Sequence, residues 1–224
     1  MTSANPKKAV VFDFDGTLVD TLPGLVEATN RVLAHSGRRA LSLDEGRTML
    51  GGGAPRLLER AFRATGEPLA EPELALSRWR AHYDECAVAG TVLFPDVVAT
   101  LEALAHRGVA MGICTSKPLG STLQLLDALN FRRFFSSVLG KGCTPTPKPH
   151  PGHLRAVLTE LEAGTDHSVM VGDSEPDVEV ARAAGVIAVL VAHGYATGAT
   201  EALGADAVIE GMADLVGLLD RWWS

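Results

Sequence analysis

Short, continuous runs of apolar residues, each ending at a polar or glycine-rich stretch, constrain the fold of this chain most strongly. They lack the alternation of a strand with one face in water, so they predict strands buried on both faces of a parallel sheet. The expected strands are Ala9–Phe12, Val109–Cys114, Ser168–Val171, Val186–Val191 and a shorter one at Ala207–Ile209.

Segments with helical spacing of apolar residues alternate with these strands from about residue 94 onward. This alternation predicts an α/β fold with a doubly wound, Rossmann-like parallel sheet. The expected helices are Val97–His106, Ser121–Leu129, Gly152–Leu161, Asp177–Ala184 and Met212–Trp222.

Residues 20–90 follow a different pattern. Leu22–His35, Arg56–Ala64 and Glu73–Cys86 have helical spacing, and only glycine and proline signals stand between them. We therefore expect two domains: an α/β core made of residues 1–19 and 91–224, and an inserted all-helical domain made of residues 20–90. An insertion after the first strand would form a lid over the edge where open sheets bind ligands.

The composition narrows the range of partners. Twenty basic and 27 acidic residues give a net charge of -7, which argues against nucleic acid, because phosphate backbones bind basic faces. The apolar run at Ala9–Phe12 is too short for a signal peptide or a membrane span. With three cysteines at separations unsuited to a metal site, we expect a soluble cytoplasmic protein with reduced thiols and no membrane partner.

The polar residues with catalytic potential come directly after predicted strands or in an adjoining loop. In a doubly wound sheet such loops converge on one crevice. These residues are Asp13 and Asp15 after the first strand, Thr115, Ser116 and Lys117 after the second, Lys148 in a proline-rich loop, and Asp173 and Asp177 after a later strand.

Four carboxylates brought close together repel one another and need a compensating cation. Oxygen ligands without histidine or cysteine favour Mg²⁺, which keeps positions open for water and a substrate phosphate. Lys148 and Thr115 could then bind phosphoryl oxygens. A carboxylate nucleophile would divide hydrolysis into two steps through an acyl phosphate, and a second carboxylate could transfer the protons.

Each of these residues also has an ordinary structural explanation. Asp13 and Asp15 could belong to a turn or a helix cap, and Lys148 could be a solvated lysine. Asp173 and Asp177 could cap the helix that starts near Pro176. Only their joint arrangement, in this order along the chain, favours catalysis.

Taken together, the motifs resemble the phosphatase branch of the haloacid dehalogenase-like superfamily over nearly the whole chain. The matching motifs are Asp13–Asp20, Thr115–Lys117, Lys148–Pro151 and Gly172–Asp177. The resemblance implies a helical cap in residues 20–90, whose closure would exclude water.

The resemblance also implies roles for single residues. Asp13 would be the nucleophile and a Mg²⁺ ligand, and Asp15 the acid and base, with its backbone carbonyl on the metal. Asp173 would be a further ligand, and Asp177 would bind the metal, directly or through water, or support the residues that do. Lys148 would take part in catalysis and bind the phosphoryl group.

Thr115 and Ser116 would also bind the phosphoryl group, although Ser116 stands where the family commonly has asparagine. Within the superfamily, Leu50–Ala61, Gly90–Pro95 and His193–Tyr195 resemble the phosphoglycolate phosphatases. The implied partner is a small phosphorylated metabolite, with 2-phosphoglycolate as the best single expectation.

Several alternatives stay open from the sequence. They are a phosphomutase, a phosphatase for another sugar phosphate or pyrophosphate, and, more remotely, a non-catalytic binding protein. A phosphonatase is excluded because no lysine lies between Lys8 and Lys117 to form a Schiff base. The candidates for binding a substrate carboxylate in the cap are Arg47, Arg56 and Arg60, and the oligomeric state stays undecided.

Overall fold

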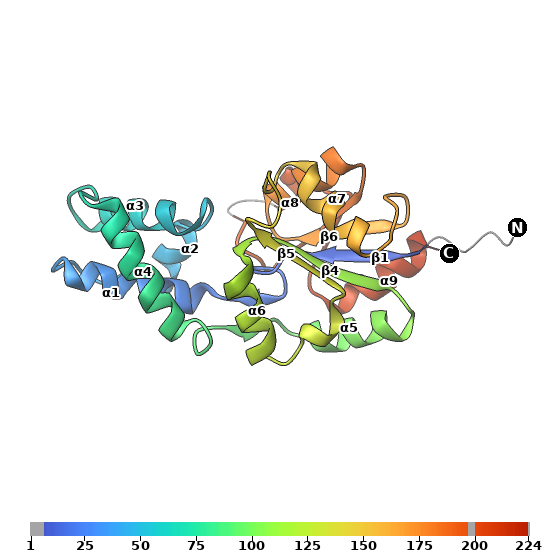
Figure 1. Ribbon diagram of the computed structural model, residues 1–224, viewed down its shortest axis with the longest axis horizontal. Helices are drawn as coiled ribbons and strands as arrows, with labels where there is room; N and C mark the ends of the chain where they lie inside the picture. The colour runs from blue at the N-terminus through green and yellow to red at the C-terminus, as the bar shows by residue number, and fades with distance from the viewer. Residues whose placement is uncertain (1–6, 197–199, 224) are drawn as a thin grey trace, which may run out of the picture. The chain divides into compact units, whose positions relative to one another are not determined.

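The computed structural model describes residues 7–196 and 200–223. The chain divides into two compact units. One is an α/β unit made of the residues up to Val19 and from Leu93 onward, and the other is a helical unit, Asp20–Val92 (Figure 1).

The α/β unit contains a six-stranded parallel sheet with the strand order β5-β4-β1-β6-β7-β8. Phe12, the last residue of β1, pairs with Ile113 of β4 and Val171 of β6, so the residues that follow these positions are neighbours at the carboxyl edge. The strands are β1 Ala9–Phe12, β4 Ala110–Pro118, β5 Ser137–Lys141, β6 Ser168–Gly172, β7 Ile187–Val191 and β8 Ala207–Ile209.

Helices cover both faces of this sheet. The helices are α5 Val97–His106, α6 Leu119–Ala128, α7 Pro151–Glu160, α8 Glu175–Ala184 and α9 Ala213–Trp222, with 3₁₀ turns η1 Arg132–Phe134 and η2 Thr200–Leu203. Helices α7 and α8 lie above the strands in Figure 1 and α5, which packs against α9, lies below them. On the α7 and α8 side, Val11 and Met170 of the sheet pack with Leu154, Val157 and Val178 of the helices in one buried cluster.

The α/β, doubly wound parallel sheet predicted from the sequence is confirmed, with differences in detail. Strand β5 was not predicted, because Ser137–Lys141 holds only two large apolar residues, Val138 and Leu139. Strand β4 does not end at Cys114 but continues through Pro118, with a break in its register against β5. Helix α8 begins at Glu175, two residues before the predicted start at Asp177.

The helical unit consists of α1 Leu22–His35, α2 Leu43–Thr48, α3 Gly53–Thr65 and α4 Pro72–Cys86. Helix α1 packs against α4, where the indole nitrogen of Trp79 donates a hydrogen bond to Thr29 Oγ1 at 3.0 Å. Helix α2 was not predicted, because six residues are too few for a periodic pattern. A separate two-stranded sheet pairs β2 Val19–Asp20 with β3 Val92–Leu93.

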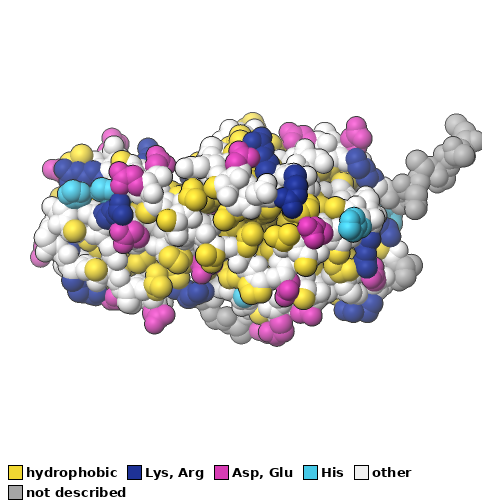
Figure 2. Space-filling view, turned by 90° about the horizontal axis from the view of Figure 1, so that it is seen from below, with side chains coloured by type: hydrophobic (Ala, Val, Ile, Leu, Met, Phe, Trp, Pro, Cys, Tyr) yellow, Lys and Arg dark blue, Asp and Glu magenta, His cyan; other side chains and the backbone are white. Residues whose placement is uncertain are grey.

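The charge pattern of the surface and the apolar character of the helices bear on whether the chain binds nucleic acid or a membrane. Basic and acidic side chains are interspersed on the face shown in Figure 2, so the described residues of this face carry no continuous basic patch. Among the described helices, none is both long and apolar enough to cross a membrane.

The three cysteines are free thiols, with Cys86 and Cys114 buried and Cys143 exposed.

Candidate active site

The carboxyl ends of β1 and β6 bring three of the expected carboxylates together. Asp13 directly follows β1, and its backbone N–H donates a hydrogen bond to the carbonyl of Val171 at 2.8 Å. One carboxylate oxygen from each of Asp13, Asp173 and Asp177 lies within 4.8 Å of the other two, and the three residues are buried. We refer to them as the aspartate cluster.

Burial and mutual repulsion oppose ionisation of the aspartate cluster. The pKa of Asp13 is raised to about 6, chiefly by burial; the charge of Asp177 also raises it, and the charge of Lys148 partly offsets the rise. Burial, together with the charges of Asp177 and Asp13, raises the pKa of Asp173 well above its ordinary range. The cluster therefore favours an added positive charge.

Lys148 supplies part of that charge from the loop before α7. Its ammonium nitrogen lies 3.0 Å from Asp13 Oδ1 and 2.6 Å from Asp177 Oδ1, and its side chain is 1% exposed. Although burial disfavours the charged form, the attraction of Asp13 and Asp177 raises the pKa of Lys148. The lysine stays charged and fixes the position of both carboxylates.

The start of α8 orients Asp177. Its Oδ2 accepts hydrogen bonds from the backbone N–H groups of Asp173 at 3.2 Å and Ser174 at 3.1 Å, and from Ser174 Oγ at 2.9 Å. This arrangement is a capping box, which satisfies the free N–H groups at the start of the helix. Both oxygens of Asp177 thus have protein partners, one at the helix cap and one on Lys148.

Two glycines allow the backbone to approach Asp173. A Cβ atom on Gly16, whose φ is 82°, would lie 2.4 Å from Asp173 Oδ2, and a Cβ on Gly194 would lie 2.1 Å from Asp173 Cβ. Neither distance is compatible with a side chain at these positions. The backbone N–H of Tyr195, next to Gly194, donates a hydrogen bond to Asp173 Oδ2 at 2.7 Å.

The loop that carries Gly194 was not assigned a role in the site from the sequence. Its His193 ring lies 4.1 Å from the ring of Phe94, and His193 Nε2 lies 3.2 Å from the carbonyl oxygen of Thr17. These contacts hold the loop against the turn that follows Asp13. The abrupt change from the apolar strand β7 to His193-Gly194-Tyr195 was the sequence signal for this role.

The residues expected after the second strand lie inside β4. Thr115 is buried, and its hydroxyl accepts a hydrogen bond from the backbone N–H of Lys117 at 3.2 Å; Ser116 is exposed. The buried Lys117 extends its ammonium group to Asp15, 3.2 Å from Oδ1 and 3.3 Å from Oδ2. The sequence motif included Lys117 but gave no indication of this contact.

The donor atoms at this edge of the sheet fit a hard divalent cation. Asp13 Oδ1 is buried, and although Lys148 Nζ is 3.0 Å away, no hydrogen bond of suitable geometry reaches it from the described residues. The aspartate cluster and Asp15 carry four negative charges when ionised, and the buried Lys117 and Lys148 carry two positive charges. The remaining two negative charges equal the charge of one divalent cation.

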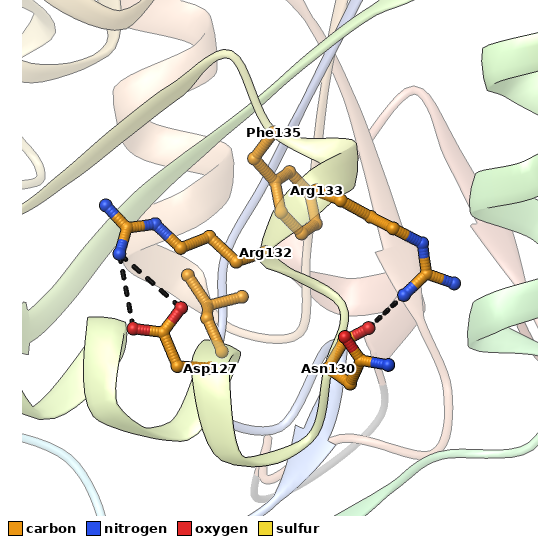
Figure 3. A pocket seen from close by; sticks show the side chains of 6 residues that line it. Asp127, Asn130, Arg132, Arg133 and Phe135 are labelled. Carbon is orange, nitrogen blue, oxygen red and sulfur yellow. Dashed lines mark hydrogen bonds and ion pairs between the residues drawn. The ribbon is translucent and has the colours of Figure 1, made fainter.

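A surface hollow of about 440 Å³ elsewhere on the α/β unit has a different chemistry (Figure 3). Its arginines are engaged in local contacts, Arg132 with the carboxylate of Asp127 and Arg133 with the carbonyl of Asn130. It contains none of the residues expected at the site, so the aspartate cluster is the stronger candidate. The lining residues are Leu126, Asp127, Asn130, Arg132, Arg133 and Phe135.

A doubly wound sheet with buried carboxylates and a lysine at its carboxyl edge defines the class as an α/β enzyme suited to phosphoryl chemistry. The chain belongs to the haloacid dehalogenase-like hydrolase family, whose sequence profile matches residues 10–191.

Similar proteins extend this match. The chain is 41% identical over 214 residues to a phosphoglycolate phosphatase of Rhodospirillum rubrum, covering 93% of this chain and 89% of the relative. It is 41% identical over 208 residues to one of Caulobacter vibrioides, covering 92% and 88%. A solved structure described as a predicted phosphoglycolate phosphatase from Haemophilus somnus has a TM-score of 0.87 and 28% identity, covering 95% of this chain and 97% of that one. The resemblance to the family and its phosphatase branch is thereby confirmed.

Proposed function

We propose that this chain is a Mg²⁺-dependent phosphatase that hydrolyses a small phosphorylated metabolite through an aspartyl-phosphate on Asp13. The observation that carries the proposal is the buried aspartate cluster with Lys148 in contact with both Asp13 and Asp177. The names of the relatives support 2-phosphoglycolate as the first substrate to test.

The residues present suit a Mg²⁺ site. Asp13, Asp173 and the backbone carbonyl of Asp15 would hold the ion, and Asp177 would either bind it or keep Asp173 and Lys148 in place. When bound, the ion neutralises phosphate charge. Since Asp177 accepts from Asp173 N–H and from Lys148, the supporting role agrees best with its hydrogen bonds.

We propose the following chemical steps for these side chains. Thr115, Ser116 and Lys148 bind the phosphoryl oxygens. An oxygen of Asp13 forms a bond to phosphorus as the bond to the leaving oxygen breaks, and Asp15 donates a proton to that oxygen. Water then attacks phosphorus, Asp15 takes a proton from it, and the bond to Asp13 breaks.

The helical insertion, expected at residues 20–90 and compact from Asp20 to Val92, is proposed to be the cap that selects the substrate. Of its three candidate arginines, Arg60 donates hydrogen bonds to the carbonyls of Met49 and Leu50 at 2.9 and 2.7 Å. Arg56 pairs with Glu59 at 2.9 Å. Arg47, Arg56 and Arg60 all stay candidates for a substrate contact, each to be tested as a single alanine variant.

The test is a panel of phosphorylated metabolites, 2-phosphoglycolate included, ranked by kcat/KM with Mg²⁺ and with EDTA. We expect phosphate release that requires Mg²⁺, and a loss of about 10³-fold or more in Asp13→Asn. The exposed Asp166→Asn is the matched control and should keep wild-type activity.

Two outcomes would count against the proposal. One is the absence of phosphate release from any ester, and the other is full activity of Asp13→Asn. Conversion of one sugar phosphate into another without phosphate release would identify a phosphomutase instead.

A further inference from the structure

The carboxylate of Asp15 has its own buried cation. Lys117 Nζ lies 3.2 and 3.3 Å from the two oxygens of Asp15, and the Lys117 side chain is 5% exposed. Asp15 is the partly exposed member of the pair, with a side chain 26% exposed. A lysine this deeply buried is rare unless its charge is compensated, so the contact with Asp15 is a specific feature of the site.

The backbone of β4 is shaped to place Lys117 there. Cys114 pairs with Leu139 of β5, and the next pair joins Pro118 to Lys141, so three residues of β4 stand opposite the single Gly140. Such bulges redirect side chains beside functional sites. A Cβ on Gly140 would lie 2.6 Å from the carbonyl oxygen of Lys117, so this approach requires glycine.

The two buried lysines serve different carboxylates. Lys148 contacts Asp13 and Asp177, which belong to the aspartate cluster, whereas Lys117 contacts Asp15, whose carboxylate is not a member of that cluster. The side chain of the proposed acid and base is thus in contact with a different lysine from the side chains of Asp13 and Asp177.

We propose that Lys117 is a positioning residue for proton transfer by Asp15. This inference rests on the proposed function, because it concerns the acid and base of that reaction. The ammonium group fixes the rotamer of the Asp15 carboxylate and compensates the negative charge that remains after Asp15 gives its proton to the leaving oxygen. It acts through Asp15 and needs no contact with the substrate.

The dependence of the reaction rate on the leaving group separates a positioning role of Lys117 from phosphoryl binding and from a purely structural role. An alkyl alkoxide is a poor leaving group and needs a proton from Asp15, whereas p-nitrophenolate leaves well without one. Loss of Lys117 should therefore reduce the first step with an alkyl phosphate far more than with p-nitrophenyl phosphate. A lysine that bound the phosphoryl group, or only stabilised the fold, would affect both esters equally.

The experiment compares kcat/KM for p-nitrophenyl phosphate with that for 2-phosphoglycolate or glycerol phosphate, whichever alkyl ester the wild type hydrolyses faster. In Lys117→Met we expect kcat/KM to fall about 10- to 100-fold for the alkyl ester and less than about 3-fold for the aryl ester. The Mg²⁺ concentration for half-maximal activity should stay unchanged, because the aspartate cluster is untouched.

Three further variants complete the test. Lys117→Arg keeps a cation that can reach both carboxylate oxygens of Asp15. Its ratio of kcat/KM for the two esters should therefore stay close to the wild-type ratio. Asp15→Asn should change the ratio in the same direction as Lys117→Met. Lys141→Met, at an exposed lysine on β5, should leave it at the wild-type value. If Lys117→Met does not fold, Lys117→Gln takes its place as the variant without a cation, and Lys117→Arg stays the variant that keeps one.

A wild-type ratio of kcat/KM for the two esters in Lys117→Met, or in Lys117→Gln where it replaces Lys117→Met, would overturn the inference. A shift in the Mg²⁺ requirement that accounts for the whole loss of activity would also overturn it. If the wild type releases no phosphate from any ester, the proposed function itself fails. These two failures are therefore distinguishable.

Discussion

At the scale of single residues, Asp13 lies among groups with opposing effects on its charge. Burial and the carboxylate of Asp177 favour the neutral acid, whereas Lys148 favours the carboxylate. In the protein without metal the first two effects are larger, because the pKa is raised from 3.8 to about 6. A nucleophile must be ionised, so the metal-free site is strained electrostatically at neutral pH.

This electrostatic strain predicts how the stability of the metal-free protein depends on pH. Because the folded pKa of Asp13 is about 6 and the unfolded value 3.8, the folded state binds the proton more tightly between these values. Stability should therefore fall as the pH rises through this window. At pH 7 in EDTA, Asp13→Asn should raise the free energy of unfolding by about 1 to 3 kcal/mol.

Urea unfolding in EDTA at several pH values measures this effect, with Asp166→Asn as the control. A less stable Asp13→Asn protein at pH 7 would show that the attraction of Lys148 outweighs burial and repulsion.

The types of residue at the site could be predicted from the sequence, because Asp13, Thr115 and Asp173 come just after apolar runs and Lys148 lies in an adjoining proline-rich loop. The hydrogen bonds and ion pairs that these residues form could not be predicted so well. The contact between Lys117 and Asp15 depends on the bulge in β4, which arises from pairing with β5 and leaves no local pattern.

At the scale of elements, loops that follow the strands fix the orientation of the carboxylates. The loop after β7 illustrates this, because Tyr195 N–H donates to Asp173 and Gly194 leaves room for its Cβ. The strands with uniform apolar runs, β1 and β8, were predicted with their observed bounds. Strand β5 was missed because it holds only two large apolar residues, Val138 and Leu139, and helix α2 was missed because six residues are too few for a periodic pattern.

Gly194→Ala should weaken metal activation. The added Cβ would lie 2.1 Å from Asp173 Cβ and 2.7 Å from its Oδ2, so either Asp173 or the loop must move. We expect the Mg²⁺ concentration for half-maximal activity to rise about 10-fold or more, as for groups that orient metal ligands.

Gly211→Ala is the matched control, because an added Cβ there has no heavy atom within 4 Å. The measurement is a Mg²⁺ titration of phosphate release. An unchanged titration in Gly194→Ala would show that the loop does not hold Asp173 in place.

At the scale of the whole molecule, the chain forms two compact units. All residues proposed to hold the metal and the phosphoryl group lie in the α/β unit, whereas the helical unit, Asp20–Val92, has its own packing between α1 and α4. The alternation of strand and helix predicted the first unit, and helical periodicity predicted most of the second. Neither pattern contains information about which ester the enzyme prefers.

Hydrogen exchange should distinguish the units when Mg²⁺ is added. A ligand that binds only the folded site slows the openings that expose it. Amides of Asp13–Thr17 and Asp173–Asp177 should therefore exchange more slowly with Mg²⁺, and those in the middle of α1 and α4 should be unchanged. Equal slowing in both units would contradict a metal site made by the α/β unit alone.

The most direct test of the central claim is to trap the phosphorylated enzyme. Enzyme in excess over substrate is quenched during the first turnover, reduced with borohydride, which converts an acyl phosphate to an alcohol, and digested for mass spectrometry. The account predicts that Asp13 alone becomes homoserine, within the time of the first turnover, and that Asp13→Asn shows no conversion. Phosphate release in the same samples with no conversion at Asp13, or with conversion at another carboxylate, would contradict it.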